Sequence, residues 1–210
     1  MKRYSLSSIF TEAFRDNLGW EKAWTKRQPK KEYQIIIVGG GGHGLATAYY
    51  LVKNYNITDI AVIEKGWIGG GNTGRNTTII RSNYLQESSI GIYEKSRFLY
   101  ETLSQDLNYN IMFSPRGVLM LCQTEHELRA MKRTSHANRI NGVDTKMIAP
   151  EEVKEIVPII NINGPRFPVL GALWQPRGGT ARHDAVAWGY ARKCSDFGID
   201  IIEPVSYTHL

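Results

Sequence analysis

The sequence has few of the features that define special classes of protein. It contains only two cysteines, Cys122 and Cys194, which are far apart and not arranged as CxxC, so neither a disulfide framework nor a zinc site is indicated. No apolar run reaches the length of a signal-peptide core or of a membrane span. We therefore expect a cytoplasmic protein that has reduced cysteines, holds no metal and makes no contact with a membrane.

The charged residues are spread too evenly along the sequence to indicate a particular binding partner. The chain has 26 Lys and Arg residues against 20 Asp and Glu residues, a balance that suits anionic cofactors but is too diffuse to argue for nucleic acid. The hydrophobic fraction of 42% is that of a globular protein. A length of 210 residues allows one large domain, or one domain and part of another.

Residues 1–32 are expected to form an N-terminal arm. The arm contains aromatic patches and a basic run from Lys26 to Lys31. Such runs are usually solvated linkers, and we favour this interpretation over a docking arm for an acidic partner. Trp20 and Trp24, one helical turn apart, are predicted to cover an apolar surface or a partner subunit.

The most informative stretch, residues 33–64, is typical of a strand, a glycine turn, a helix and a second strand. An apolar run over 33–38 precedes the turn GGGGHG (Gly39–Gly44), and apolar residues after the turn recur at i, i+3, i+4 and i+7, which marks one face of a helix. A second apolar run, 60–63, ends at Glu64. This order of elements predicts a dinucleotide site.

Each residue type in this stretch suits such a site. Gly39 permits a sharp exit from the strand, Gly41 lets a pyrophosphate approach the backbone, and Gly44 lets the helix pack closely on the sheet. Glu64 is placed to accept hydrogen bonds from ribose hydroxyls, and its charge disfavours NADP. A glycine turn without a ligand is less favoured because strand, helix and acid occur in register. The motif alone does not separate FAD from NAD.

A second glycine-rich stretch, 65–81, follows where a simple dinucleotide domain would enter a crossover helix. Small residues, side-chain amides and an arginine at this place suit a long cofactor with two phosphates and a flavin. Arg75 is therefore a candidate cation beside a phosphate or the flavin edge. Arg81 follows an apolar pair and would be carried inward, where a substrate carboxylate would pair with it. A polar surface loop is the alternative.

Three segments resemble a known family: GGGGHGLATAYYL (Gly39–Leu51), EKGW (Glu64–Trp67) and GGNTGRNTTIIRSNY (Gly70–Tyr84). They are similar to the beta subunit of heterotetrameric sarcosine oxidase, within the FAD-dependent amine oxidases related to D-amino acid oxidase. The third segment is the most specific, and the similarity is expected over residues 30–202.

The resemblance implies an α/β fold in which a Rossmann-like FAD-binding domain of the glutathione-reductase type is joined to part of an α+β substrate domain. We expect the first part of the FAD-binding domain over 33–110 and part of the substrate domain over 111–175. The chain would then return to a truncated FAD-binding domain over 176–210.

The resemblance also implies which residues bind the cofactors. Non-covalent FAD would be held by Gly39, Gly41, Gly42, His43, Gly44, Glu64, Asn72, Arg75, Asn76 and Thr77. His183, which taken alone would be a structural histidine at a helix start, corresponds to the residue that carries FMN covalently through the flavin 8α-methyl carbon. Asp184 would hold its tautomer and Arg182 would stabilise the anionic flavin. Arg81 would face the substrate carboxylate.

The activity implied by the resemblance is oxidative demethylation of sarcosine (N-methylglycine). FAD would accept the hydride equivalent, electrons would pass to the covalent FMN, and O2 would reoxidise that flavin to give H2O2. The products would be glycine and either formaldehyde or methylenetetrahydrofolate. The partners would be alpha, gamma and delta subunits, with NAD and tetrahydrofolate bound on a partner subunit.

Two other hypotheses remain. A single-subunit FAD-dependent amine or amino-acid oxidase or dehydrogenase would share the glycine turn but lack the FMN. A non-catalytic flavin-binding assembly module would use Trp20, Trp24 and the basic run as its docking surface. An NAD dehydrogenase is disfavoured because the second glycine loop has no role in it.

The rest of the sequence predicts scaffold. Helices are expected over 87–107, from 124 to about 141, from 150 and over 185–197, and strands over 117–121 and 199–202, with a TxxE capping box at 124–127. Residues after Ile202 depart from the family pattern, and the chain has about half the family's length. We therefore expect a fragment with a foreign tail, in which His209 has no functional role.

Overall fold

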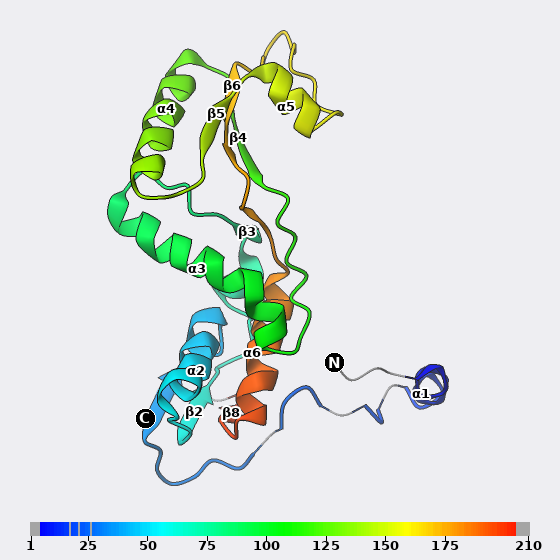
Figure 1. Cartoon of the computed structure of the whole chain (residues 1–210). Helices are drawn as coiled ribbons and strands as arrows, with labels where there is room; N and C mark the ends of the chain where they lie inside the picture. Colours follow the sequence, from blue (N-terminus) through cyan, green and yellow to red (C-terminus); the bar gives the residue numbers. More distant parts are fainter. Residues whose placement is uncertain (1–4, 17, 21, 26, 205–210) are drawn as a thin grey trace. The chain divides into compact units, whose positions relative to one another are not determined.

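The computed structural model describes residues 5–16, 18–20, 22–25 and 27–204, and the chain divides into two compact units (Figure 1). The first unit comprises Met1–Thr77, Ser104–Ile111 and Arg182–Leu210, and the second comprises Thr78–Leu103 and Met112–Ala181. The expectation of a foreign tail concerns residues 203–210, of which 205–210, and with them His209, lie outside the described residues. The domain boundaries predicted from the sequence stay a prediction.

A parallel three-stranded sheet forms the centre of the first unit. Its strands, in the spatial order β1-β2-β8, are Ile35–Val38, Ile60–Ile63 and Asp200–Ile202. All four residues of β2 are buried, as expected for a central strand of a parallel sheet that helices cover. The two strands predicted around the glycine turn are therefore confirmed.

The helices that lie wholly in the described part of the first unit are α1 (Leu6–Ala13), α2 (Gly42–Tyr55), the 3-10 helix η1 (Asn72–Arg75) and α6 (His183–Asp196). α2 and α6 lie side by side (Figure 1), and the Tyr49 ring of α2 stacks on Phe197 at a centroid distance of 5.9 Å. The predicted helical face is confirmed, because Leu45, Ala48 and Tyr49 are the buried residues of α2. α6 begins two residues earlier than predicted.

Cys194 lies in this helix interface. Its thiol is fully buried and donates to the backbone carbonyl of Leu45 at 3.5 Å. Burial raises the pKa of the Cys194 thiol to about 12. Cys122 is also a buried free cysteine, and burial raises the pKa of its thiol as well.

The N-terminal arm is attached to the first unit. The Trp24 indole donates to the Glu203 carboxylate at 2.9 Å. Arg27 donates to the carbonyl oxygen of Gly198 at 3.1 Å and lies 3.6 Å from the Asp200 carboxylate. Residues 27–31 of the basic run are exposed and form no helix or strand, which agrees with a solvated linker, and Arg27 adds a contact with the first unit.

The second unit contains an antiparallel sheet and a short strand pair. The sheet has the order β4-β6-β5, with strands Val118–Cys122, Gly171–Gln175 and Lys146–Ile148. β3 (Ile79–Ile80) pairs with β7 (Gly179–Thr180) in antiparallel register. The short pair was not predicted, because two-residue strands carry no periodicity in the sequence.

The helices of the second unit follow the predicted boundaries closely. They are α3 (Glu87–Asp106, whose last turn enters the first unit), α4 (Glu125–Ile140) and α5 (Pro150–Ile156). The predicted capping box is confirmed: the Thr124 hydroxyl accepts from the Glu127 amide, and the Glu127 carboxylate accepts from the Thr124 amide. Within the described ranges, the structure contains no helix whose length and apolar character would let it cross a membrane.

Gly44 and Gly91 provide a matched test of the helix–strand packing. A Cβ atom at Gly44 would lie 2.1 Å from the backbone oxygen of Gly39, whereas a Cβ at Gly91 of α3 would meet open space. We expect Gly44→Ala to lower the midpoint of thermal unfolding, measured by circular dichroism. Gly91→Ala should leave the midpoint unchanged or raise it, since Ala favours a helix interior by roughly 0.5–1 kcal/mol. Equal stability of the two variants would contradict the close packing at Gly44.

Candidate functional site

The candidate site lies at the edge of the parallel sheet where all three strands end. Gly39 follows β1, Glu64 follows β2 and Glu203 follows β8. Backbone hydrogen bonds hold these strand ends beside one another. The Gly39 amide donates to the Ile63 carbonyl oxygen at 2.8 Å, and the Glu64 amide donates to the Ile202 carbonyl oxygen at 3.0 Å. Open α/β sheets bind ligands at this edge, so the topology places the predicted acid and the glycine turn together.

The glycine turn leads directly into an open helix N-terminus. Gly39 has a φ of +109°, a left-handed conformation that favours glycine. α2 begins at Gly42, its N-cap Gly41 makes no side-chain capping bond, and no acidic residue lies in its first turn, which includes His43 and Gly44. The positive end of the helix dipole therefore has no anion from its own first turn, which suits a phosphate.

Glu64 connects the glycine turn to the loop that follows β2. Its Oε2 accepts from the Gly40 amide at 2.7 Å, and its Oε1 accepts from the Gly66 amide at 2.8 Å. Each carboxylate oxygen can accept more than one hydrogen bond. Glu64 can thus hold the two loops and still accept from ribose hydroxyls.

The second glycine loop packs against the first, and Thr73 makes the contact. The Gly42 amide donates to the Thr73 hydroxyl at 2.9 Å, and the Gly69 amide donates to the Gly40 carbonyl oxygen at 3.0 Å. Thr73 was not among the predicted site residues, although a hydroxyl in a loop of small residues after the predicted acid was a usable signal. The structure therefore brings the two predicted glycine loops together.

The remaining candidates of the second loop are exposed polar residues in or just after η1. They are Asn72, Arg75, Asn76 and Thr77. The Asn76 amide donates to the Thr73 carbonyl oxygen at 2.7 Å. Arg75 forms no ion pair with any carboxylate in the described part of the chain, so its charge is available to a phosphate.

His183 is the first residue of α6, which contacts η1. Its Nδ1 atom is buried and has no hydrogen-bond partner among the described residues. The Asp184 carboxylate accepts from Arg182 through both oxygens, at 3.0 Å from Nε to Oδ1, and from the Ala185 amide at 2.8 Å. The arginine hydrogen bond holds the pKa of Asp184 below its usual range.

One expectation at α6 is therefore corrected. Asp184 does not hold the His183 tautomer, because Arg182, which directly precedes His183 and exposes its guanidinium, takes both carboxylate oxygens. Among the described residues, no carboxylate bonds to the buried Nδ1 of this imidazole. Arg182 is likewise committed to an acid, which raises the pKa of its guanidinium.

Arg81 belongs to the second unit, whereas every other candidate residue belongs to the first. Its guanidinium donates to the Asn83 side-chain oxygen at 2.8 Å and lies over the Tyr84 ring at 4.2 Å from the centroid. The described residues supply it with no carboxylate. Its side chain is half-buried, which agrees with the expectation that Arg81 is carried inward.

Comparison with protein families agrees with this geometry. Residues 34–210 match the family of FAD dependent oxidoreductases. The chain belongs to that family, and the predicted FAD-binding α/β fold is confirmed.

Individual relatives and one solved structure resemble the chain more specifically than the family description does. The chain is 65% identical over 208 residues to "Sarcosine oxidase subunit beta" of Rhodobacter capsulatus, covering 99% of this chain and 50% of the relative. It is 56% identical to the protein of the same name from Arthrobacter sp., over 90% of this chain and 47% of that one. The L-proline dehydrogenase of P. horikoshii superposes with a TM-score of 0.76 at 31% identity, over 84% of this chain and 45% of that one.

The predicted resemblance to sarcosine oxidase beta subunits is thus confirmed. The similarity extends beyond the expected stretch 30–202, since the match with the Rhodobacter capsulatus protein covers 99% of the chain. The chain spans about half the length of these curated relatives.

The residues at the sheet edge fit the FAD that this family uses. Glycines leave the start of α2 open, Glu64 lies at the end of β2 with its carboxylate against the glycine turn, and the exposed second loop supplies amides and an arginine. Thr73 fixes the distance between the two loops.

Thr73 offers a test of this site. We expect Thr73→Val, which keeps the shape but removes the acceptor for the Gly42 amide, to weaken FAD binding about tenfold, since an unmet buried hydrogen bond costs about 1–3 kcal/mol. Thr73→Ser retains the hydroxyl and should bind FAD within about twofold of the parent. Flavin fluorescence titration of apoprotein measures both constants. Equal loss in the two variants would show that the hydroxyl is not the important group.

Proposed function

We propose that the chain is the FAD-binding part of the beta subunit of a sarcosine oxidase, an enzyme that oxidatively demethylates N-methylglycine. The observation that carries the proposal is the 65% identity, over 99% of this chain, to a protein named sarcosine oxidase subunit beta. The open α2 N-terminus and the paired glycine loops support it because they match the cofactor of the family.

The chain's own residues bind and orient FAD in this proposal. Gly39, Gly41 and Gly44 keep the strand–helix turn close to the pyrophosphate, and Glu64 accepts from the ribose hydroxyls. Arg75 neutralises part of the phosphate or flavin charge. FAD, when bound, supplies the hydride acceptor for the C–H bond of the substrate N-methyl group.

Arg81 binds the substrate carboxylate. Its guanidinium is half-buried and has no acid among its described neighbours, so an incoming carboxylate would give it a charge-assisted partner. The Tyr84 ring supports one face of the guanidinium and leaves the donors at its edge available. This contact would select amino acids over simple amines.

His183 carries the second flavin, FMN, as a covalent group. The buried Nδ1 of His183 has no partner among the described residues, and the neighbouring acid is committed to Arg182. A neutral imidazole is a competent nucleophile toward an electrophilic flavin carbon. Bound FMN supplies the site at which O2 is reduced to H2O2. The products are glycine and formaldehyde, or methylenetetrahydrofolate.

The proposed assembly contains alpha, gamma and delta subunits, with NAD and tetrahydrofolate on a partner subunit, in the cytoplasm. The names "subunit beta" of the relatives support a multi-subunit complex. Two buried free thiols suit a reducing compartment. A purely non-catalytic module loses part of its proposed docking surface, because the Trp24 indole already binds Glu203.

Anaerobic reduction tests the activity. We expect sarcosine to bleach the flavin absorbance of the full-length protein that contains this sequence, in its assembled complex. Arg81→Gln should lower kcat/KM about 10- to 100-fold, since a hydrogen bond to a charged group contributes about 1.5–3 kcal/mol. Arg116→Gln, an exposed arginine of the same unit, should change it less than about twofold. Flavin that sarcosine never bleaches would argue for a non-catalytic module.

Peptide mapping tests the second flavin. After denaturation and proteolysis, a fluorescent flavin peptide should contain His183, and non-covalent FAD should be released. His183→Ala should lose the flavin peptide and retain FAD, whereas His126→Ala, an exposed histidine of α4, should keep both. Release of all flavin from the parent protein would favour a single-flavin oxidase.

A further inference from the structure

Arg81 is followed by two of the most buried polar residues in the chain. Ser82 is 0% exposed and Asn83 is 2% exposed. Buried polar groups require hydrogen-bond partners, so the partners of these residues determine how the segment after β3 is held. That segment carries the guanidinium proposed to meet the substrate.

The side-chain amide of Gln175 makes two hydrogen bonds to Ser82, one to its backbone amide and one to its hydroxyl. The Ser82 amide donates to Gln175 Oε1 at 3.1 Å, and Gln175 Nε2 donates to the Ser82 hydroxyl at 2.7 Å. Gln175 is itself 0% exposed and is the last residue of β6, the central strand of the antiparallel sheet. A side-chain amide that makes two bonds to one residue fixes both its position and its orientation.

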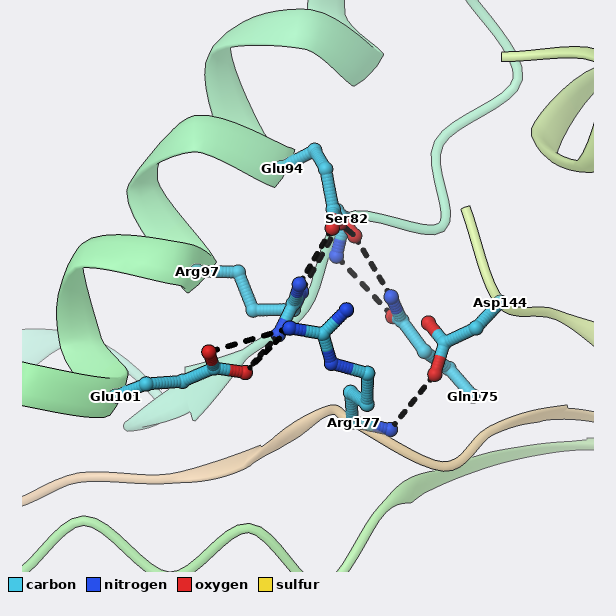
Figure 2. A network of polar contacts seen from close by, with 7 residues as sticks. All are labelled: Ser82, Glu94, Arg97, Glu101, Asp144, Gln175 and Arg177. Atoms are coloured by element: carbon cyan, nitrogen blue, oxygen red, sulfur yellow. Dashed lines mark hydrogen bonds and ion pairs between the residues drawn. The ribbon is translucent and has the colours of Figure 1, made fainter. Parts of the chain in front are cut away.

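The Ser82 hydroxyl is tied to α3 by a charged acceptor. It donates to Glu94 Oε2, and the Glu94 carboxylate accepts two hydrogen bonds from Arg97, which is 1% exposed. Figure 2 shows these contacts, and it shows that Arg97 continues to Glu101. The Arg97 hydrogen bond holds the pKa of Glu94 below its usual range, so the acceptor is a carboxylate at neutral pH.

The guanidinium of Arg81 is held by uncharged groups alone among the described residues. Asn83 Oδ1 accepts from it, and the Asn83 amide in turn donates to Met120 Sδ at 3.5 Å. The Tyr84 ring below it stacks on Tyr93 at a centroid distance of 4.2 Å. The side chain is thus fixed without neutralisation of its charge.

We propose that Ser82, Gln175 and Glu94 are positioning residues that aim Arg81 at the substrate carboxylate. The network removes conformational freedom from the segment before a ligand arrives, and a preordered cation binds its anion with less entropic cost. This inference rests on the proposed function, because it takes Arg81 as the carboxylate-binding group. Its specificity consequence is a preference for amine substrates that carry a carboxylate.

The test uses the FAD-loaded full-length protein and three substitutions at the two ends of the Ser82–Gln175 contact. Ser82→Ala removes the hydroxyl and Ser82→Thr retains it, while Gln175→Leu removes both bonds to Ser82. We expect Ser82→Ala and Gln175→Leu to raise the KM for sarcosine and the inhibition constant of acetate about tenfold or more. FAD affinity should be unchanged, and Ser82→Thr should recover most of the loss.

Arg177→Gln is the matched control. Arg177 is 50% exposed at the far end of the same network, where it binds Glu101. Its loss leaves the Ser82–Gln175 and Ser82–Glu94 contacts in place, so KM should remain within about twofold of the parent.

A double-mutant cycle separates positioning from general stability. In an Arg81→Gln background, Gln175→Leu should have no further effect on KM, because the group that it positions is already gone. An equal effect in both backgrounds would overturn the inference. If Gln175→Leu does not fold, the Ser82→Ala and Ser82→Thr pair decides in its place, and equal KM values in these two variants would also overturn it. An Arg81→Gln variant with an unchanged KM would contradict the proposed function instead.

Discussion

The carboxylate of Glu64 is the contact on which the cofactor side of the molecule depends. It accepts from an amide in each of the two loops at the sheet edge, so one ionised group fixes loops that leave different places in the chain. A carboxylate accepting backbone N–H groups is a strong hydrogen-bonding arrangement. These two bonds hold the glycine turn against the second loop. The same two segments contain the start of α2 and the Thr73 contact.

In the second unit, a buried arginine and its two acids connect several segments of the chain. Arg97 is almost fully buried and its charge is met by Glu94 and Glu101 on the same helix, as a buried cation requires. These acids then reach other segments: Glu94 accepts from the Ser82 hydroxyl, and Glu101 accepts from Arg177, which lies just after β6. Each unit therefore uses one ionised side chain as the junction of several backbone segments.

The sequence was sufficient for elements whose signal is local. Periodicity located β1, α2 and β2, and the TxxE pattern located the start of α4. It could not give contacts between distant segments, such as Thr73 with Gly42, or the commitment of Asp184 to Arg182. The buried arginine was partly visible, since acids at i−3 and i+4 flank Arg97 on a predicted helix, but burial itself depends on packing against other segments.

The burial of Cys194 bears on the chemical durability of the chain. Thiols react with oxidants as thiolates, and a thiol with a pKa of about 12 that is enclosed between α2 and α6 is neither ionised nor accessible at neutral pH. In an enzyme proposed to release peroxide, a reactive cysteine beside the cofactor helix would be oxidised during turnover. This one fills the helix interface as an inert apolar group, so repeated exposure to the product should leave the packing of the cofactor helix intact.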